Sequence, residues 1–164
     1  MNNTLGTVEE MLAWANGIIE SRPPDFTISD GDDQPYMERW FVVPRNPAGG
    51  CYIHRVLRSD KDTHHDHPWD NTSYVLDGEY EEECLYEGGL TARFRRRPGA
   101  IIHRKATDAH RLILPEGGGP VTTLFLLGPW QRDWGFHCPK GWVPWWDFTA
   151  EDKGRVGRGC GEYA

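Results

Sequence analysis

The chain has 164 residues and a formal net charge of −7 at pH 7, with 26% charged and 38% hydrophobic residues. This length suits one domain with a sizeable core and is short for two. The negative charge argues against sequence-independent binding to nucleic acid, which needs a basic surface. No stretch approaches the roughly 20 apolar residues that cross a bilayer. We therefore expect a soluble globular protein whose partners are neither nucleic acids nor membranes.

The N-terminus and the cysteines bear on the cellular compartment. The opening segment, MNNTLGTVEEMLAWANGIIESRPPDF, has neither the basic head nor the apolar run of a secretory signal. The four cysteines are Cys51, Cys84, Cys138 and Cys160, with no C-x-x-C pair among them. The simplest interpretation is a cytoplasmic protein with reduced thiols.

Residues 1–34 are expected to form an N-terminal helix and a linker. Thr7 followed by Glu10 makes a capping box, in which each side chain bonds the other residue's backbone N–H. Apolar residues then recur at helical spacing, at Met11, Leu12, Trp14, Ala15, Ile18 and Ile19. Pro23 and Pro24 end the helix, because proline fixes its φ angle and lacks an N–H donor.

Residues 35–150 change to the period-2 alternation of β-strands. The pattern is carried by short runs that each close at a Gly, Pro, Asp or Asn turn: YMERWFVVPR, CYIHRVLR, TSYVLDG, YEEECLYEG, TARFRR, GAIIHRK, AHRLILPEG and VTTLFLLG. Regular short strands without intervening helices predict an all-β domain, either an antiparallel barrel or a sandwich. The last segment, 151–164, is Gly-rich and polar and is expected to be a flexible tail.

Potential metal ligands cluster at the entrance to one of these strands, in HHDHPWDNTSYVLDG, residues 64–78. Strand alternation puts His65 and His67 on one face. Two imidazoles so placed can share a divalent ion, with nitrogen–metal distances of roughly 2.0–2.1 Å for zinc. A third ligand has to come from another strand. The best candidate is His110, which follows a polar turn in RPGAIIHRKATDAHRLIL.

Together the two segments resemble the two sequence motifs of the cupin superfamily. Motif one of that family joins a His-x-His pair to a Glu and a closing Gly, and here His65, His67 and Gly78 match it. Motif two begins with a Gly, continues through Pro-x-Gly and ends on a His, and Gly99 and His110 stand at that separation. Each motif alone is a weak signal, whereas both together, in order and at the right interval, are fairly specific.

The resemblance covers about residues 51–127 and implies a cupin-like antiparallel β-barrel, or jelly roll, with the N-terminal helix packed outside it. It also implies that the three matching histidines bind a divalent metal. Lys105 and Thr107 stand where motif two has its Pro and Gly. The match is therefore incomplete in motif two as well as in the Glu of motif one.

The motif-one Glu is replaced by Asn71, a neutral residue and a poor ligand for a divalent cation. Asp70 would serve as a fourth ligand if the strand entry is bulged. Alternatively, it would accept a hydrogen bond from the second ring N–H of a metal-binding His. Otherwise the site consists of three imidazoles with open positions, which resembles the all-His iron centres of the thiol dioxygenase branch of cupins. His64 is a further candidate if the register is displaced by one residue.

A rival metal-binding pattern overlaps the first. His64, Asp66 and His110 would form the 2-His-1-carboxylate triad of iron oxygenases. Those enzymes usually carry a basic residue downstream for the carboxylate of a cosubstrate. The ten residues after His110 contain only the adjacent Arg111. We therefore favour the set of three histidines.

Two other features are candidates for the pocket wall. His54 and Arg55 alternate in CYIHRVLR, so one of them points into the barrel, and parity alone does not say which. An inward Arg55 would clamp a substrate carboxylate. The segment 128–148 holds five of the eight tryptophans and is either a hydrophobic plug or an aromatic lid over a substrate.

The combined prediction is a divalent-metal-binding enzyme, a non-haem iron dioxygenase that acts on a small organic substrate. Fe(II) is the expected metal, with Zn, Ni or Mn as alternatives, and Asp70, Asn71 and Arg55 are the expected catalytic-site residues around the ligands. Two other classes stay open: a metal-independent small-molecule binding barrel or sensor, and an isomerase or epimerase with His67 or His110 as general base. Pairing of two copies into a homodimer stays open as well.

Overall fold

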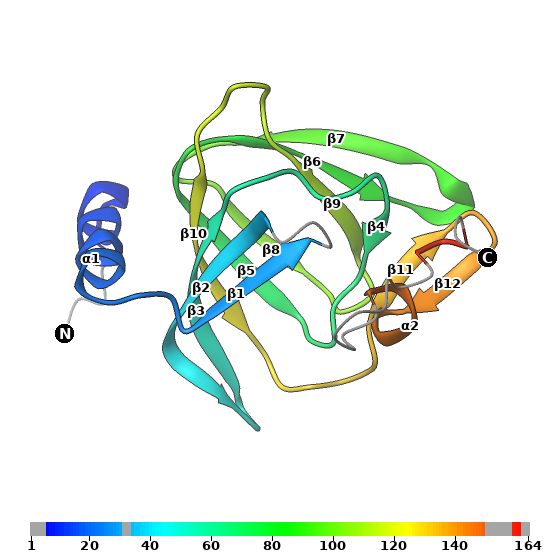
Figure 1. The fold of residues 1–164 in the computed structure, drawn as a ribbon, viewed down its shortest axis with the longest axis horizontal. Helices are drawn as coiled ribbons and strands as arrows, with labels where there is room; N and C mark the ends of the chain where they lie inside the picture. Colours follow the sequence, from blue (N-terminus) through cyan, green and yellow to red (C-terminus); the bar gives the residue numbers. More distant parts are fainter. Residues whose placement is uncertain (1–5, 31–33, 150–158, 162–164) are drawn as a thin grey trace.

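The computed structural model describes residues 6–30, 34–149 and 159–161, and these form a mostly β protein with two antiparallel sheets (Figure 1). The first sheet has the order β1 (Phe26–Asp30), β2 (Gln34–Asn46), β3 (Gly49–Val56), β10 (Val121–Leu127), β5 (Asn71–Asp77) and β8 (Ile101–Arg104). The second has the order β12 (Gly141–Pro144), β11 (Gly135–Cys138), β4 (His64–His65), β9 (Ala109–Ile113), β6 (Tyr80–Leu85) and β7 (Thr91–Arg96). The helical elements are α1 (Val8–Ser21), the 3-10 turn η1 (Glu87–Gly89) and α2 (Trp145–Thr149). The predicted all-β jelly roll with an N-terminal helix is confirmed.

Helix α1 begins at the predicted capping box and packs outside the barrel (Figure 1). Thr7 Oγ1 accepts a hydrogen bond from the Glu10 amide at 3.2 Å, and Glu10 Oε2 accepts one from the Thr7 amide at 2.8 Å. The helix covers the outer side of the first sheet, and the buried apolar cluster between them consists of Ala15, Trp40, Ile53 and Leu76. None of the helices in the described ranges has the length and apolar character that crossing a bilayer requires.

The strands divide the barrel interior into an apolar end and a polar middle. The apolar cluster draws on both sheets and consists of Met37, Val56, Val75, Tyr80, Ile102 and Val121. On β5, alternation continues the same inner face through Ser73 and Asn71, and on β8 it continues through Arg104. The functional side chains therefore lie in the barrel, further along the strands that build the apolar end.

The boundary between linker and barrel differs from the predicted one. Residues 26–30, predicted as linker, form the edge strand β1, which pairs with β2 and places Phe26 opposite Arg39. So short a run at a sheet edge takes its conformation from the neighbouring strand, and its own pattern is too brief to predict it. Helix α2 likewise adds one short helix to a region expected to hold only strands.

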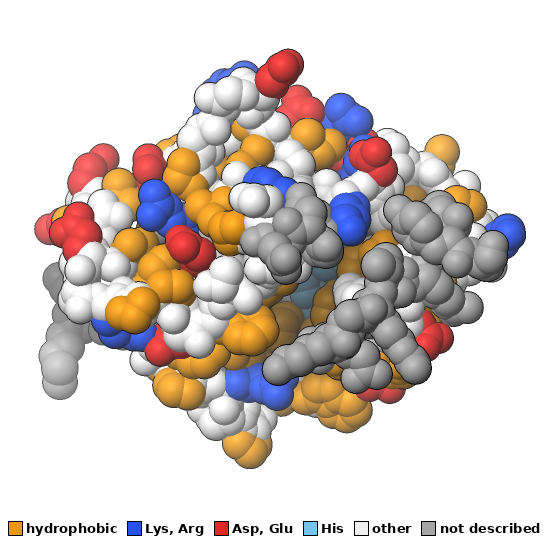
Figure 2. Space-filling model, in the orientation of Figure 1, with side chains coloured by type: hydrophobic (Ala, Val, Ile, Leu, Met, Phe, Trp, Pro, Cys, Tyr) orange, Lys and Arg blue, Asp and Glu red, His pale blue; other side chains and the backbone are white. Residues whose placement is uncertain are grey.

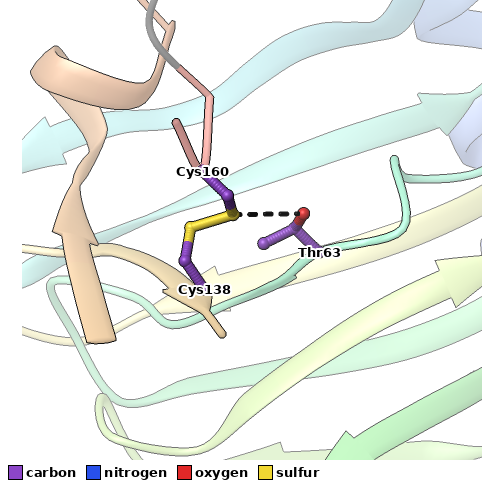
Figure 3. The surroundings of a disulfide bond; sticks show 3 residues. All are labelled: Thr63, Cys138 and Cys160. Carbon is purple, nitrogen blue, oxygen red and sulfur yellow. Dashed lines mark hydrogen bonds between the residues drawn. A yellow bond between two sulfur atoms is a disulfide. The ribbon is translucent and has the colours of Figure 1, made fainter. Parts of the chain in front are cut away.

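The cysteines differ from the expectation of reduced thiols. Cys138 on β11 and Cys160 form a disulfide, with their Cα atoms 5.3 Å apart and Thr63 beside Cys160 (Figure 3). Cys51 and Cys84 are free. The disulfide bridges a sequence separation of 22 residues, so only the fold brings its two sulfur atoms together.

The disulfide also bears on the predicted flexible tail, 151–164. Residues 159–161 form a turn that the disulfide fixes to the second sheet, so the tail is not loose at Cys160. The rest of that segment, 151–158 and 162–164, lies outside the described residues.

Replacing Leu76 by Ala should destabilise the protein strongly, because Leu76 is 1% exposed between α1 and the first sheet. A buried Leu→Ala change costs about 2–5 kcal/mol through lost burial and the cavity left behind. Leu126→Ala is the matched control: Leu126 lies on the neighbouring strand β10, is 44% exposed, and should cost less than about 1 kcal/mol. Urea unfolding followed by tryptophan fluorescence measures both. Equal losses would contradict the helix packing described above.

Candidate metal centre

Three histidines converge inside the barrel. His65 ends β4, His67 follows it in the next loop, and His110 lies on β9 directly opposite His65. Each offers one ring nitrogen, and the three nitrogens all lie within 4.8 Å of one another. Figure 2 shows a hollow in this face of the molecule with histidine side chains, in pale blue, at its floor. The structure thus brings together the residues predicted as metal ligands.

The spacing of the nitrogens suits a single ion. Nε2 of His67 and Nε2 of His110 are 2.9 Å apart. Two nitrogens that each bind a metal at about 2.1 Å, at right angles, stand about 3.0 Å apart. The ring of His65 lies 5.1 Å from that of His67 and 5.0 Å from that of His110, centroid to centroid. The group therefore fits three positions around one divalent ion.

A buried carboxylate that the sequence pattern did not indicate fixes the ring of His110. Nδ1 of His110 lies 2.9 Å from Oε1 of Glu82, whose side chain is 1% exposed. An ionised carboxylate only accepts, so Nδ1 carries the proton and Nε2 presents its lone pair to the site. Such pairs orient metal-binding histidines and raise their basicity. Glu82 belongs to the run EYEEE, which is typical of a solvated strand, and only its alternation with the inward Tyr80 could have singled it out.

Two arginines hold Glu82 in its ionised form. Arg104 Nε donates to Oε1 at 2.6 Å, and Arg96 Nε donates to Oε2 at 2.7 Å. Burial alone would raise the pKa of Glu82, but the hydrogen bond from His110 and the charge and hydrogen bond of Arg104 hold that pKa well below its usual range. A permanent negative charge therefore stands directly behind His110.

Burial also keeps the imidazoles of His67 and His110 neutral. Burial, aided by the charge of Arg104, lowers the pKa of His110 to about 4. Burial lowers the pKa of His67 well below its usual range, and the nearby His65 and His110 act in the same direction. A neutral imidazole has a free nitrogen lone pair, which metal binding requires. His67 and His110 are thus ready to bind an ion at neutral pH.

A second carboxylate stands behind His65. Nδ1 of His65 lies 3.9 Å from Oδ2 of Asp60. The amide of Leu112 at 2.6 Å and the hydroxyl of Tyr36 hold Asp60 in place. With Nδ1 turned toward this carboxylate, Nε2 is the nitrogen of His65 left for an ion.

Aromatic rings enclose the three histidines. His67 stacks on Trp69, with centroids 5.6 Å apart. The centroid of His65 lies 6.3 Å from that of Trp134 and 6.0 Å from that of Phe136. These last two rings come from the Trp-rich segment, whose strand β11 pairs with β4 through Phe136 and His65. The segment is therefore part of the sheet and forms one wall of the site.

The rival triad of His64, Asp66 and His110 does not form. Asp66 is 1% exposed and its carboxylate is already occupied. Its donors, at 2.9–3.0 Å, are Gly135 N, His137 Nε2, Trp142 Nε1 and Arg132 Nη1. Burial alone would raise the pKa of Asp66, but these hydrogen bonds lower it below its usual value. His64 points away from the site, with Nε2 3.2 Å from Glu83, so Asp66 fastens the Trp-rich segment to the barrel instead.

Asp70 and Asn71, predicted to lie beside the ligands, take other positions. Asp70 is exposed, and its Oδ1 accepts a hydrogen bond from the Ala106 amide at 2.7 Å, which holds the turn between β8 and β9. Asp70 is not part of the group of ligand atoms, so it makes no fourth ligand. Asn71 is buried, with Oδ1 3.3 Å from Nη1 of Arg104. Asn71 is connected to His110 through hydrogen bonds, because Arg104 also donates to Glu82 and Glu82 accepts from His110.

Arg55 points out of the barrel, which corrects its predicted position as an inward clamp. Its neighbour His54 is the inward residue: it is 5% exposed and stacks on Phe125, with centroids 4.7 Å apart. Alternation puts Arg55 on the outer face with Ile53, which packs under α1. Strand parity separates His54 from Arg55, but only the sheet packing shows which of them faces inward.

Solved structures share this fold. DMSP lyase DddQ from Ruegeria pomeroyi DSS-3 matches with a TM-score of 0.58 at 14% identity, covering 86% of this chain and 74% of the lyase. Fe(II)-HppE with the alternative substrate (S)-1-HPP matches with a TM-score of 0.53 at 17% identity, covering 65% of this chain and 56% of HppE. The chain has the cupin fold. Manganese-containing oxalate decarboxylase from Bacillus subtilis extends this cupin similarity, with a TM-score of 0.52 at 14% identity over 73% of this chain and 30% of that one.

The similarity is one of fold. No protein-family model matches this cupin-fold chain, and no curated protein is significantly similar to it in sequence. The chain spans little more than half of HppE and less than a third of the decarboxylase. The chemistry of this chain therefore has to be argued from its own site.

Glu82→Gln should weaken divalent-metal binding about 10- to 100-fold, because the amide no longer fixes the proton of His110 on Nδ1. Glu83→Gln is the matched control: Glu83 is the next residue along β6, but it binds Arg111 and Arg93 rather than the three-histidine group. Competition titration of the metal-free proteins with Zn(II) and a chromophoric chelator measures the affinity. Wild-type affinity in Glu82→Gln would contradict the assigned role of Glu82.

The metal-free protein should lose stability as the pH falls from about 6.5 to about 4. His110 has its ordinary pKa of 6.5 when unfolded but titrates only near 4 when folded. Within this window the unfolded state binds more protons, so the free energy of unfolding falls with the pH. Denaturant unfolding in the presence of a chelator, at several pH values across the window, measures the slope. His110→Gln should make the slope shallower without abolishing it, because burial also lowers the pKa values of His67 and His54. Replacing the exposed His103 by Gln should leave the slope unchanged, and a flat wild-type profile would contradict the shift.

Proposed function

We propose that this protein is a divalent-metal enzyme, a non-haem iron dioxygenase that acts on a small organic substrate. The observation that carries the proposal is the group of His65, His67 and His110, with ligand atoms within 4.8 Å of one another. The group lies inside a cupin-fold barrel, with the carboxylates of Glu82 and Asp60 behind His110 and His65. An imidazole set of this kind is typical of iron, zinc or nickel sites.

Fe(II) is the metal proposed for this donor set. Held by three imidazoles, Fe(II) would supply open coordination positions at which dioxygen and a substrate meet. The matched HppE structure contains Fe(II), and the matched decarboxylase has Mn(II) centres. Mn is therefore an alternative metal here, as are Zn and Ni.

The residues of the chain would orient the metal ligands, exclude water and select substrates by their charge. Glu82 keeps the proton of His110 on Nδ1, away from the ion. Trp69, Trp134 and Phe136 pack around the histidines and limit access of bulk water. Because imidazoles are neutral ligands, they leave the positive charge of a divalent ion uncompensated. The site would therefore prefer substrates with an anionic or chelating group.

A metal-independent isomerase or epimerase is the second candidate. The pair of His110 and Glu82 favours it, since a histidine held by a carboxylate is a common general base. The pKa of His110, lowered to about 4 by burial, makes this imidazole a weak base at neutral pH. Efficient general bases titrate near the working pH, so we rank this candidate second.

Protein purified without a metal-binding tag should contain close to one iron per chain, and the double variant His65→Ala/His67→Ala should contain none. His64→Ala is the matched control, because His64 is adjacent in sequence but faces Glu83 instead of the group. Inductively coupled plasma mass spectrometry measures the metals. Oxygen uptake is then screened with small acids and thiols.

The outcomes separate the candidates. Iron lost only in the double variant, together with substrate-dependent oxygen uptake, supports the dioxygenase. Zinc or nickel at the same level, without oxygen uptake, keeps the metal site and contradicts the dioxygenase. A chain that holds no metal after anaerobic reconstitution contradicts both the metal site and the dioxygenase. It favours the isomerase or a binding barrel that has no catalytic activity.

A further inference from the structure

An arginine faces the same barrel interior as the three histidines. Arg39 on β2 lies opposite His54 on β3, and its Nε donates to His54 Nε2 at 3.0 Å. Its Cζ stands 5.1 Å from the centroid of the Tyr52 ring. Tyr52 and His54 lie two residues apart on β3, so they share one face of the strand, and that face is the inner one. The guanidinium of Arg39 is therefore turned inward.

No carboxylate of the described residues pairs with Arg39. The other inward arginine, Arg104, is neutralised by Glu82. Burial lowers the pKa of Arg39, and the positive charge of Arg45 on the same strand acts in the same direction. An arginine keeps its charge at every physiological pH. The barrel thus holds a half-buried positive charge without a counter-charge from the described part of the chain.

His54 does not supply that counter-charge. Burial, together with the charge of Arg39, lowers the pKa of His54 well below its usual range, so His54 is neutral. It accepts the Nε–H of Arg39 and leaves both Nη groups without an acceptor among the described residues. The planar N–H pairs of a guanidinium match the two oxygens of a carboxylate. The free edge of Arg39 is suited to an anion.

Two rings, His54 and Phe125, connect Arg39 with the metal centre. His54 stacks on Phe125 with centroids 4.7 Å apart, and Phe125 lies 6.2 Å from His67, centroid to centroid. Arg39 and the three histidines therefore face the same interior. A ligand that lies along the rings of His54 and Phe125 would meet a metal at one end and a guanidinium at the other.

We propose that Arg39 is the second anchor of a substrate with two anionic ends, a small dicarboxylate, of which one carboxylate binds the metal and the other binds the guanidinium. This inference rests on the proposed function and narrows its substrate from a small organic molecule to a dianion. Arg39 would bind the substrate carboxylate, which is the role that the sequence suggested for an inward Arg55. His54 holds the guanidinium in position by accepting from Nε.

The test measures binding of simple dicarboxylates to the Co(II)-loaded protein, whose visible absorption changes when a ligand enters the coordination sphere. Malonate, succinate and glutarate are compared with acetate, which has a single carboxylate. At least one dicarboxylate should bind about tenfold tighter than acetate, since a charged hydrogen-bonded contact of this kind commonly contributes that factor. Equal affinities for acetate and all three dicarboxylates would overturn the proposal.

Variants test whether Arg39 causes the preference for dicarboxylates over acetate. Arg39→Met should weaken the best dicarboxylate about 10- to 100-fold and leave acetate unchanged. Arg39→Gln, which keeps an N–H donor for His54, should do the same and serves if the Met variant does not fold. Arg55→Met is the matched control, an arginine on the adjacent strand that faces outward, and it should keep the wild-type preference. A preference that survives both Arg39 variants overturns the proposal.

Failure of the metal site and failure of the anion site give different results. A wild-type chain that binds no Co(II) overturns the proposed function and leaves Arg39 to be tested alone. Calorimetric titration of the metal-free protein with succinate makes that test. Binding that is lost in Arg39→Met but kept in Arg55→Met supports the anion site, and absence of binding in the wild type overturns it.

Discussion

The geometry of the metal centre depends on the buried carboxylate of Glu82. Alone in the interior this charge would be strongly disfavoured, but His110, Arg104 and Arg96 each donate to it. Removing one partner of a buried pair leaves a charge uncompensated and costs about 3–5 kcal/mol. The interaction joins β6 to β7, β8 and β9, and it also places the proton of His110 on the nitrogen that faces away from the site. The same contacts therefore stabilise the fold and leave Nε2 of His110 free to bind a metal.

Charge balance sets what the barrel can accept. Asn71 stands where the cupin motif has a ligating Glu, and the buried carboxylate stands one step back, on β6, bonded to a ligand instead of to the ion. Three imidazoles then leave a divalent ion with its full charge. Arg39 adds a further positive charge without a described counter-charge. Both features favour an anion in the hollow, and they come from opposite sides of the interior.

Local patterns in the sequence determined much of the architecture. The capping box of Thr7 and Glu10 marked the start of α1, because a helix end needs partners for its first N–H groups. Alternation placed His65 and His67 together, and the interval between the two motifs pointed to His110. The helix start and the histidine pair each depend on one segment and its adjacent turn, where the backbone period indicates which side chains share a face. His110 instead came from the resemblance to the two cupin motifs.

Only the tertiary structure decided which face is inside and which strands are neighbours. Alternation in β3 separates Arg55 from His54 but does not say that the helix covers the side of Arg55. Alternation in β6 does not reveal that the Glu82 carboxylate accepts a hydrogen bond from His110 on β9. The disulfide of Cys138 with Cys160 likewise joins segments that have no local relation. These outcomes depend on the register between distant strands, and a shift of one residue would turn every side chain of a strand to the other face. The sequence therefore determined the elements and the histidine pair, whereas the packing of the two sheets decided which charges surround them.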